Sequence, residues 1–370
     1  MIKNIQVCHL TSLHFRYDVR IFLKECKSLA RAGYNVSLVV ADGEGNEIVE
    51  GVTIYDIGKK PKCRIQRMLL TANKVFKKAI SLNATIYHIH DPELIPVGLK
   101  LKKKGLKIIF DAHEDLPKQL LSKPYIPQIV RSSLSKLIRQ YEKKVCKQFD
   151  AIVTATPSIC EKFLKINSNT IDVNNFPILD ELFMETTNSE GKNNICYIGG
   201  ISKIRGIEEL VKAIGISKSD TKLFLCGDFR EPELKNKVEK FSGWSKVKYL
   251  GLIDRNDICE VLSQSIAGIV TLWPEPNHIE SQPIKMFEYM SAGIPVIYSN
   301  FPLWMQIVEG NKCGICVDPL NPQEISTAID FLANNPETAQ EMGKNGRLAV
   351  VQRYNWELEE KKLLELYSKI

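Results

Sequence analysis

Two glutamates lie on either side of a predicted helix start in residues 273–299. Glu280 precedes Pro283, a residue type favoured at the first position of a helix, and Glu288 lies inside the predicted helix. Gly293 indicates the end of this helix. The unpaired amides and partial positive charge of a helix start favour a phosphate or diphosphate. Because Pro283 and Glu288 are roughly 7.5 Å apart along a helix, two carboxylates could bind hydroxyl groups on both sides of a diphosphate, as a nucleotide sugar requires.

The same two acids also fit a simpler interpretation, which composition alone favours. Glu280 would then be a solvated acid in a loop, and Glu288 a surface acid on a helix. The surrounding segment, and the elements that would position the acids, distinguish the two interpretations.

Predicted strands and helices alternate along the chain in two successive series. The first begins with an apolar strand at residues 5–10 and a helix that ends before Gly33, and it closes at residue 178. Residues 179–193 have the polar composition of a linker, and the series restarts over residues 194–355. We therefore predict an α/β protein with two Rossmann-like domains that face each other across a cleft, where the carboxyl ends of the strands meet.

The length and composition of the chain limit how many domains and which cellular compartment we expect. The 370 residues, 44% of them hydrophobic, exceed the usual size of a single core. No apolar run reaches the roughly 18–20 residues of a membrane-spanning helix. We therefore expect a cytoplasmic protein, or one bound peripherally at the inner face of the cell membrane. Ten scattered cysteines predict reduced thiols, and the C-x-x-C pair Cys313 and Cys316 has no second Cys or His pair nearby.

Charge is distributed unevenly along the chain. The net charge is +7, yet residues 59–147 carry +15 and the remainder −8. Within residues 64–82, apolar residues at near-helical spacing alternate with Lys74, Lys77 and Lys78, which predicts an amphipathic helix. This helix is either an ordinary solvated surface or a docking element for an anionic membrane. We expect no nucleic-acid partner, because interleaved aromatic residues and a recognisable binding module are absent.

The segment around the two acids resembles the donor-binding region of retaining family-four glycosyltransferases, which have the GT-B fold. Glu280 and Glu288 enclose seven residues, as in the E-x7-E motif of that family, and the similarity continues as E-S-x-P-x-K-x-x-E-Y-M-x-x-G-x-P-V-I. The segments HFRYDVRIF, HIHDPEL and FDAHED near the start and MGKNGR near the end also resemble the family. The resemblance implies that the last helix, residues 356–370, packs back on the first domain.

The resemblance also implies roles in donor binding. Glu288 would hold the ribose and Glu280 the transferred sugar, while the amides from Ser281 to Ile284 face the diphosphate. After the first strand of the donor domain, the family usually has an Arg and, five residues later, a Lys that clamp the phosphates. Gly200 takes the place of the Arg and Arg205 that of the Lys, so one cation is missing.

Lys203 or Lys285 would supply the missing charge, unless both simply face solvent. Contacts with the nucleotide base of the donor would come from turns such as the one that ends at Ile253. The implied donor-binding set is Gly200, Lys203, Arg205, Ile253, Ser281, Gln282, Pro283, Ile284, Lys285 and Glu288.

In the first domain, His113 of the FDAHED segment matches the histidine that the family places beside the reacting sugar. An imidazole there can bond a donor or acceptor hydroxyl, although such a histidine can also merely cap a turn. Asp18 either belongs to this region or caps the helix that begins near Val19. Together with Arg205 and Glu280, His113 forms the implied catalytic set. The implied acceptor or cleft residues are His14, Arg16, His90, Asp91 and Glu114.

The resemblance implies a retaining sugar transfer from a nucleotide-diphosphate sugar to a saccharide or a polyprenyl-diphosphate-linked saccharide, as in surface polysaccharide, O-antigen or capsule biosynthesis. No D-x-D motif for a divalent metal occurs, so we predict transfer without a metal or other cofactor. Three alternatives stay open: a GT-B sugar-nucleotide epimerase, a non-catalytic nucleotide-sugar-binding protein, and a nicotinamide-dependent oxidoreductase. The last lacks support, because no predicted strand is followed by G-x-G-x-x-G.

Overall fold

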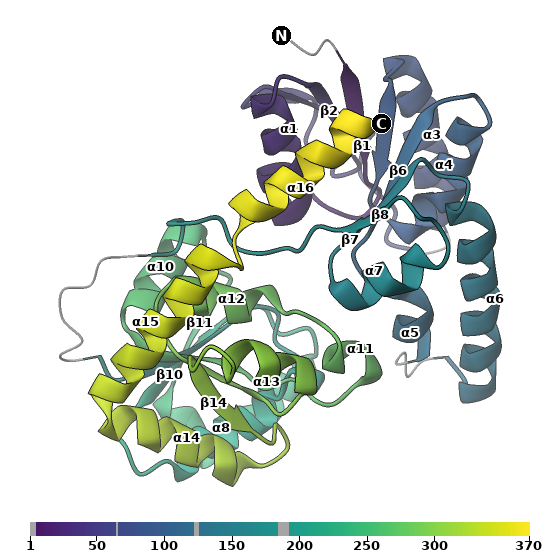
Figure 1. Ribbon diagram of the computed structural model, residues 1–370. Coiled ribbons are helices and arrows are strands. Elements are labelled where there is room, and N and C mark those ends of the chain that lie inside the picture. Colours follow the sequence, from purple (N-terminus) through teal and green to yellow (C-terminus); the bar gives the residue numbers. More distant parts are fainter. Residues whose placement is uncertain (1–4, 64–65, 122–125, 184–191) are drawn as a thin grey trace. The chain divides into compact units, whose positions relative to one another are not determined.

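A computed structural model of the chain describes residues 5–63, 66–121, 126–183 and 192–370. The chain divides into two compact units, Met1–Asn175 with Leu358–Ile370, and Phe176–Glu357. Each unit contains one β-sheet surrounded by helices (Figure 1). The predicted α/β class with two Rossmann-like units is confirmed.

The first unit has an eight-stranded sheet in the order β3-β4-β2-β1-β5-β6-β7-β8. All neighbours are parallel except β3 and β4, a short antiparallel pair that the sequence analysis did not predict. The strands are β1 (Gln6–Leu10), β2 (Asn35–Val40), β3 (Glu47–Val49), β4 (Val52–Asp56), β5 (Ile86–Ile89), β6 (Lys107–Ala112), β7 (Ala151–Thr154) and β8 (Thr170–Asp172).

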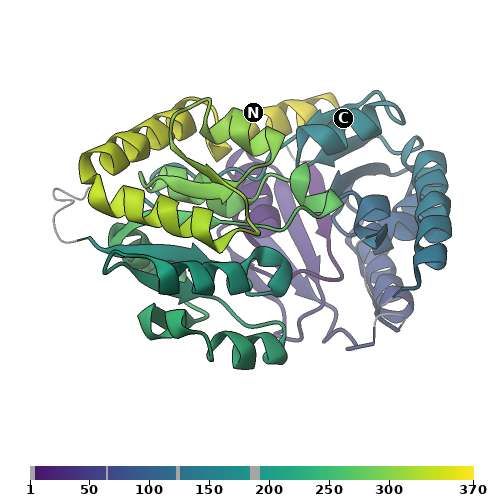
Figure 2. The same ribbon diagram turned by 90° about the horizontal axis from the view of Figure 1, so that it is seen from below.

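Helices of the first unit connect these strands, and α6 lies at the outside of the unit (Figure 2). The final helix, α16, contributes its side chains to this unit, where Glu359 accepts a hydrogen bond from the amide of Asn174. The helices are η1 (Val19–Cys26), α1 (Lys27–Arg31), η2 (Arg67–Thr71), α3 (Ala72–Leu82), η3 (Pro92–Leu94), α4 (Ile95–Lys102), α5 (Leu116–Leu121), α6 (Gln128–Cys146), α7 (Pro157–Leu164) and α16 (Trp356–Lys369).

The second unit has a six-stranded parallel sheet in the order β11-β10-β9-β12-β13-β14. Its strands are β9 (Asn194–Ile198), β10 (Lys222–Cys226), β11 (Val247–Gly251), β12 (Ser265–Val270), β13 (Val296–Ser299) and β14 (Gly314–Val317). Its helices are η4 (Lys203–Arg205), α8 (Ile207–Ile216), α9 (Pro232–Val238), η5 (Ser242–Lys246), α10 (Arg255–Ser263), α11 (Pro276–Ile279), α12 (Ile284–Ser291), α13 (Pro302–Val308), α14 (Pro322–Asn334) and α15 (Pro336–Gln352).

Side-chain alternation gives the two faces of the first sheet different characters. In β5, Tyr87 and Ile89 pack into an apolar core on one face, so His88 and the following His90 point to the opposite face. His9 of β1 joins them there, with its ring centroid 4.9 Å from that of His88. Because η1 and α16 cover this face, the histidines are fully buried.

The structure bears on the predicted linker and on the expected lack of a membrane-spanning helix. Residues 184–191 of the predicted linker lie outside the described residues, whereas Leu182 at its start is buried in the core of the second unit. None of the helices in the described part of the chain is long and apolar enough to span a membrane.

Candidate functional site

Helix α12 contacts the end of β9 through one of its own side chains. Its first residue is Ile284, and Pro283 forms its N-cap with an extended ψ of 124°, so the prediction that Pro283 is the first helical residue was wrong by one position. Gly293, at φ +73°, ends the helix in the left-handed conformation. Within the helix, the hydroxyl of Tyr289 accepts a hydrogen bond from the amide of Ile198 at 3.0 Å. The helix start therefore lies next to the glycines that follow β9.

Three cationic side chains converge on these two glycines, Gly199 and Gly200. A Cβ placed on Gly199 would lie 3.0 Å from Nζ of Lys285 and 3.6 Å from Nη1 of Arg205. A Cβ placed on Gly200 would lie 3.0 Å from Nε and 3.2 Å from Nη2 of Arg230. Within the described residues, no carboxylate forms an ion pair with any of these three cations. Such a cluster of unneutralised charge favours an anionic ligand.

Lys285 has an environment unlike that of a surface lysine. Its Nζ is buried without a hydrogen-bond partner and lies 3.8 Å from the ring centroid of Tyr197. Burial lowers the pKa of the amine below its ordinary value. Lys203, the other predicted substitute for the missing cation, is exposed, and its Nζ lies 5.3 Å from the ring centroid of Trp273. The structure therefore brings Lys285, and not Lys203, to the glycines.

Arg230 was not among the predicted site residues. It follows β10 in the segment GDFREPEL, whose composition is that of an ordinary polar loop, so no motif distinguished it. Its contact with Gly200 depends on the parallel pairing of β10 with β9, which places the loops after both strands side by side. Gly200 also lacks the side chain that would occupy the position of the guanidinium. The missing cation is thus compensated in space, by a residue remote in sequence.

Glu280 and Glu288 have different surroundings. Glu288 is mostly buried and accepts a hydrogen bond from Nη1 of Arg255 at 2.8 Å. Arg255 is also bound through two further nitrogens to Glu181, with both bonds at 2.9 Å. Glu280 is exposed and follows the short helix α11. The helix and the partner arginine therefore fix the orientation of Glu288.

One of the amides predicted to face the diphosphate already donates a hydrogen bond within the protein. The amide of Ser281 donates to the carbonyl of His278 at 3.0 Å, because α11 ends in a turn there, and this corrects its expected orientation. Within the described residues, the amides of Gln282 and Ile284 have no such partner, and the Oε1 atom of Gln282 is buried without a hydrogen bond. Ile253 packs beside the apolar core that contains α12.

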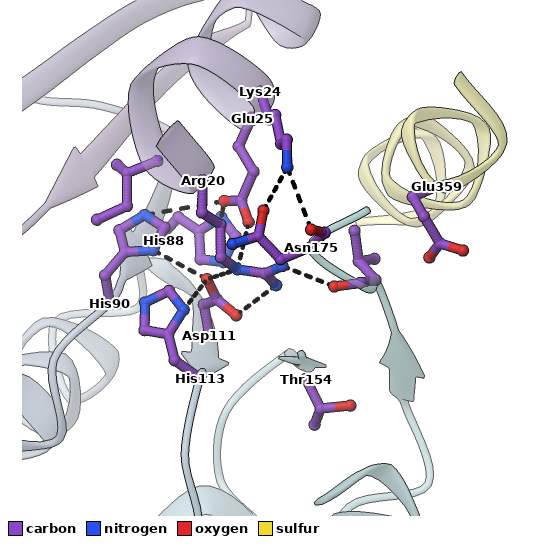
Figure 3. Close-up of polar contacts among 12 residues, drawn as sticks. Arg20, Lys24, Glu25, His88, His90, Asp111, His113, Thr154, Asn175 and Glu359 are labelled. Carbon is purple, nitrogen blue, oxygen red and sulfur yellow. Dashed lines mark hydrogen bonds and ion pairs between the residues drawn. The ribbon is translucent and has the colours of Figure 1, made fainter. Parts of the chain in front are cut away.

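Asp111 is the centre of a buried polar network in the first unit (Figure 3). Arg20 donates to it from Nε and Nη2 at 2.9 and 2.8 Å. Nδ1 of His90 lies 3.1 Å and Nδ1 of His113 3.3 Å from the same oxygen of Asp111. Burial alone would raise the pKa of Asp111, but the charge of Arg20 and the contacts with the two histidines hold it well below its usual value.

His113 presents one ring nitrogen that the protein leaves unused. With Nδ1 directed at Asp111, its Nε2 has no hydrogen-bond partner among the residues that the structure describes. Burial lowers the pKa of His113 to about 4, so the ring is neutral near pH 7 and Nε2 can accept a hydrogen bond. The ring of His14 lies 5.5 Å away between centroids. His14 is bound in turn to Asp18 at 2.9 Å.

Several predicted acceptor residues are instead used by the fold, because their polar groups already have partners. Arg16 is buried and bound to Asp42, Glu47 and the carbonyl of Gly45, which leaves it unsuited to a ligand. The positions of Asp91 and His90 likewise do not support their predicted acceptor roles. Asp91 is buried and accepts hydrogen bonds from Thr11, Ser12 and Leu13, and His90 is buried between His9 and Asp111.

Asp18 and Glu114 lie near His113 in the first unit and have different roles. Asp18 caps η1, since its carboxylate accepts hydrogen bonds from the amides of Arg20 and Ile21, which confirms the capping interpretation. Glu114 is exposed at the rim beside His113, where it binds the side-chain amide of Gln119.

Two Rossmann-like units with parallel sheets define the GT-B class of fold, and solved structures with this fold match the whole chain. Sucrose-phosphate synthase from Thermosynechococcus elongatus is 18% identical with a TM-score of 0.79, and 99% of each chain is covered. HepE of Anabaena in complex with UDP-glucose is 14% identical with a TM-score of 0.76, covering 99% of this chain and 100% of that chain. WaaG, a glycosyltransferase involved in lipopolysaccharide biosynthesis, is 14% identical with a TM-score of 0.74, covering 96% and 98%.

Family models match each unit separately. Residues 180–349 match "Glycosyl transferases group 1", and residues 19–173 match "Glycosyltransferase Family 4". Together the two models cover most of the chain, and both describe glycosyltransferases.

Two curated relatives match about half of the chain. The uncharacterized glycosyltransferase MJ1607 of Methanocaldococcus jannaschii is 27% identical over 178 residues, which are 47% of this chain and 44% of the relative. Spore coat protein SA of Bacillus subtilis is 25% identical over 191 residues, which are 48% and 49%. The chain spans about half the length of these two relatives.

Proposed function

We propose that the protein transfers a sugar from a nucleotide-diphosphate sugar to a saccharide acceptor. The observation that carries this proposal is the convergence of Arg205, Lys285 and Arg230 on Gly199 and Gly200, beside the start of α12. A diphosphate bound there would meet three cations that have no acidic partner among the described residues. Its charge would compensate the buried amine of Lys285, which no hydrogen bond satisfies.

Glu288 is proposed to bind the ribose and Glu280 the transferred sugar. Arg255 binds one carboxylate oxygen of Glu288 and holds the side chain in one orientation, and within the described residues no protein donor contacts the second oxygen. A ligand hydroxyl group can donate to that oxygen. His113, whose Nε2 is unused, is proposed to bond a hydroxyl of the donor sugar or of the acceptor.

The proposed chemistry is transfer with retention of anomeric configuration. As the glycosidic bond breaks, the sugar becomes oxocarbenium-like and the departing diphosphate gains negative charge. Arg205, Lys285 and Arg230 would stabilise that charge more in the transition state than in the ground state. We propose attack on the face that the leaving group vacates, without a metal. Trapping of a covalent glycosyl adduct on the protein, or dependence of the rate on added Mg²⁺ or Mn²⁺, would contradict these points.

The donor is best identified by thermal unfolding in the presence of UDP-, GDP- and ADP-sugars. A ligand at 100 times its dissociation constant stabilises the native state by about 2.7 kcal/mol. One of the three nucleotides is expected to give such a shift. If none does, the donor site is wrongly assigned.

Turnover assays separate the proposal from its alternatives. A transferase releases the nucleoside diphosphate and extends an acceptor. An epimerase would convert the sugar nucleotide without any acceptor, and a non-catalytic binding protein would bind the nucleotide and consume nothing.

We further propose an acceptor held at an anionic membrane surface, such as a polyprenyl-diphosphate-linked saccharide of surface polysaccharide synthesis. WaaG, which shares the fold, is named for lipopolysaccharide biosynthesis. Residues 59–147 carry the +15 charge, and apolar side chains are exposed on two of their helices. These side chains are Met68, Leu69 and Leu70 on η2 and Ile129, Val130, Leu137 and Tyr141 on α6.

Sedimentation with liposomes tests the membrane proposal. Binding is expected to anionic vesicles and not to neutral ones, and it should weaken with salt because the interaction is electrostatic. The variant Ile129→Ser/Leu137→Ser should bind more weakly than wild type. Equal binding to both kinds of vesicle, at any salt concentration, would contradict the proposal.

A further inference from the structure

Four buried side chains of the first unit surround a common point on the polar face of its sheet. They are His9 of β1, Glu25 of η1, and His88 and His90 at β5, and each is 0% exposed. One ligand atom from each lies within 4.8 Å of the others. None of these atoms belongs to the proposed donor site. We propose that these four residues form a structural Zn²⁺ site, and this proposal does not depend on the proposed function.

The distances around Glu25 carry the argument. Its Oε2 lies 3.7 Å from Nδ1 of His88, and 4.0 Å both from Nδ1 of His9 and from Nε2 of His90. These separations are too long for hydrogen bonds, and within the described part of the chain neither carboxylate oxygen has a hydrogen-bond partner. Tetrahedral Zn²⁺ with bonds of about 2.0–2.2 Å places its ligand atoms about 3.4 Å apart. The observed carboxylate-to-imidazole distances exceed that spacing by about 0.3–0.6 Å, a small contraction for side chains.

The buried carboxylate needs a cation or a proton. An ionised carboxylate without hydrogen bonds is costly in a protein interior. Arg20 lies 3.2 Å from the Oε1 atom of Glu25, but its Nε and Nη2 donors are directed at Asp111. A divalent ion facing Oε2 would neutralise the charge that Arg20 does not. The rival arrangement is a neutral, protonated Glu25, and the experiment below distinguishes the two.

His9 and His90 have surroundings like those of metal-binding histidines, whereas Nδ1 of His88 contacts the Tyr367 hydroxyl at 2.9 Å and would exchange this contact for the ion. Metal-binding histidines usually donate their second ring N–H to a carboxylate or a similar group, which fixes the ring. Nδ1 of His90 lies 3.1 Å from Asp111, which leaves Nε2 for the ion. The Tyr367 hydroxyl on α16 lies 3.5 Å from Nε2 of His9. Binding would replace the present 2.8 Å contact between Nδ1 of His9 and Nε2 of His90, with the proton of His9 moving to Nε2 beside Tyr367.

The ligand set indicates both the kind of ion and its role. Three imidazole nitrogens and one carboxylate suit Zn²⁺ or Co²⁺ better than Mg²⁺ or Ca²⁺, which prefer oxygen ligands. Four protein ligands leave no open position, as in structural zinc sites. The ion would link β1, η1 and β5 beneath α16. It would thereby stabilise the first unit without taking part in sugar transfer.

Titration of the full chain with Co²⁺, after treatment with a chelator, tests the site. We expect a single equivalent to give the visible absorption of tetrahedral Co²⁺, without the near-ultraviolet band of cobalt bound to thiolate. Zn²⁺ should displace it and raise the melting temperature. No tetrahedral spectrum from folded protein, or a thiolate band from the cysteines, would overturn the proposal and leave Glu25 as a neutral acid.

Variants identify the ligands. His88→Gln and Glu25→Gln should weaken Co²⁺ binding at least tenfold, whereas His278→Gln, which removes a histidine from the second unit, should bind as wild type does. If the ligand variants do not fold, Tyr367→Phe decides, because loss of a group that orients the ligands weakens metal binding about tenfold or more. Wild-type affinity in folded His88→Gln, or in Tyr367→Phe when the ligand variants fail to fold, would overturn the site.

Discussion

Arg20 and Asp111 form a two-pronged ion pair that is wholly buried in the first unit, with nitrogen–oxygen distances of 2.9 and 2.8 Å. The third donor of Arg20, Nη1, binds the carbonyl of Val173 after β8 at 2.7 Å. Because Asp111 also contacts Nδ1 of His113, the ion pair orients the ring whose Nε2 is proposed to meet the substrate. Arg20 is therefore a positioning residue that acts on His113 through Asp111.

Loss of both partners should destabilise the first unit less than the two single losses added together. Arg20→Met leaves the Asp111 carboxylate buried without its cation and is expected to lower the free energy of unfolding of the first unit by about 3–5 kcal/mol. The double variant Arg20→Met/Asp111→Leu should be less destabilised than the sum of the two single variants, because neither charge is then unpaired. Urea denaturation of all four proteins measures this coupling, and simple additivity would show that the pair is not a unit.

Arg230 should bind the donor diphosphate although it is remote in sequence from the motif. Arg230→Ala is expected to weaken nucleotide-sugar binding about 10- to 100-fold, the loss of one charged hydrogen bond of about 1.5–3 kcal/mol. Gly200→Ala should weaken binding as well, because its Cβ would meet the guanidinium at 3.0 Å. The control is Arg353→Ala, an exposed arginine of the same unit. Calorimetric affinities for Arg230→Ala equal to those of the control would show that Arg230 does not contact the donor.

Lys285 should make donor binding sensitive to alkaline pH. Burial lowers the pKa of its amine below the ordinary value of 10.5, so Lys285 loses its proton at a lower pH than a surface lysine. Binding of the diphosphate favours the charged form, and the affinity should therefore fall as the pH rises from neutrality toward 10.5. Lys285→Arg keeps its charge throughout this range. A ratio of wild-type to Lys285→Arg affinity that stays constant with pH would contradict the assignment.

Glu288 should be needed for the ribose and not for folding. Glu288→Ala is expected to abolish the stabilisation by nucleotide sugar in thermal unfolding, while its unfolding temperature without ligand changes little, since Arg255 keeps its two bonds to Glu181. Glu341→Ala, which removes an exposed acid of α15, is the matched control. An unchanged ligand-induced shift in Glu288→Ala would remove the ribose assignment.

Local patterns in the sequence predicted much of the fold. The strand–helix alternation identified both sheets, and the cap by Asp18 was one of the two interpretations that the sequence offered for this residue. The β3–β4 pair was missed because β3 has only three residues, too few to show an alternating pattern. The helix start at Ile284 was displaced by one residue, since proline is compatible with both the N-cap and the first helical position.

Residue types and spacing were therefore sufficient to determine the α/β class and the position of the two acids around one helix start, and the resemblance to the family implied that one cation is absent at Gly200. Only the tertiary structure decided which cation takes its place, because parallel pairing of β9 with β10 brings Arg230 to Gly200 across thirty positions of sequence. It likewise decided that His90, Asp91 and Arg16 serve the fold, and that Glu25 faces three histidines. Local sequence specifies the conformation of a segment, whereas the partners of a polar side chain depend on which segments the sheet places side by side.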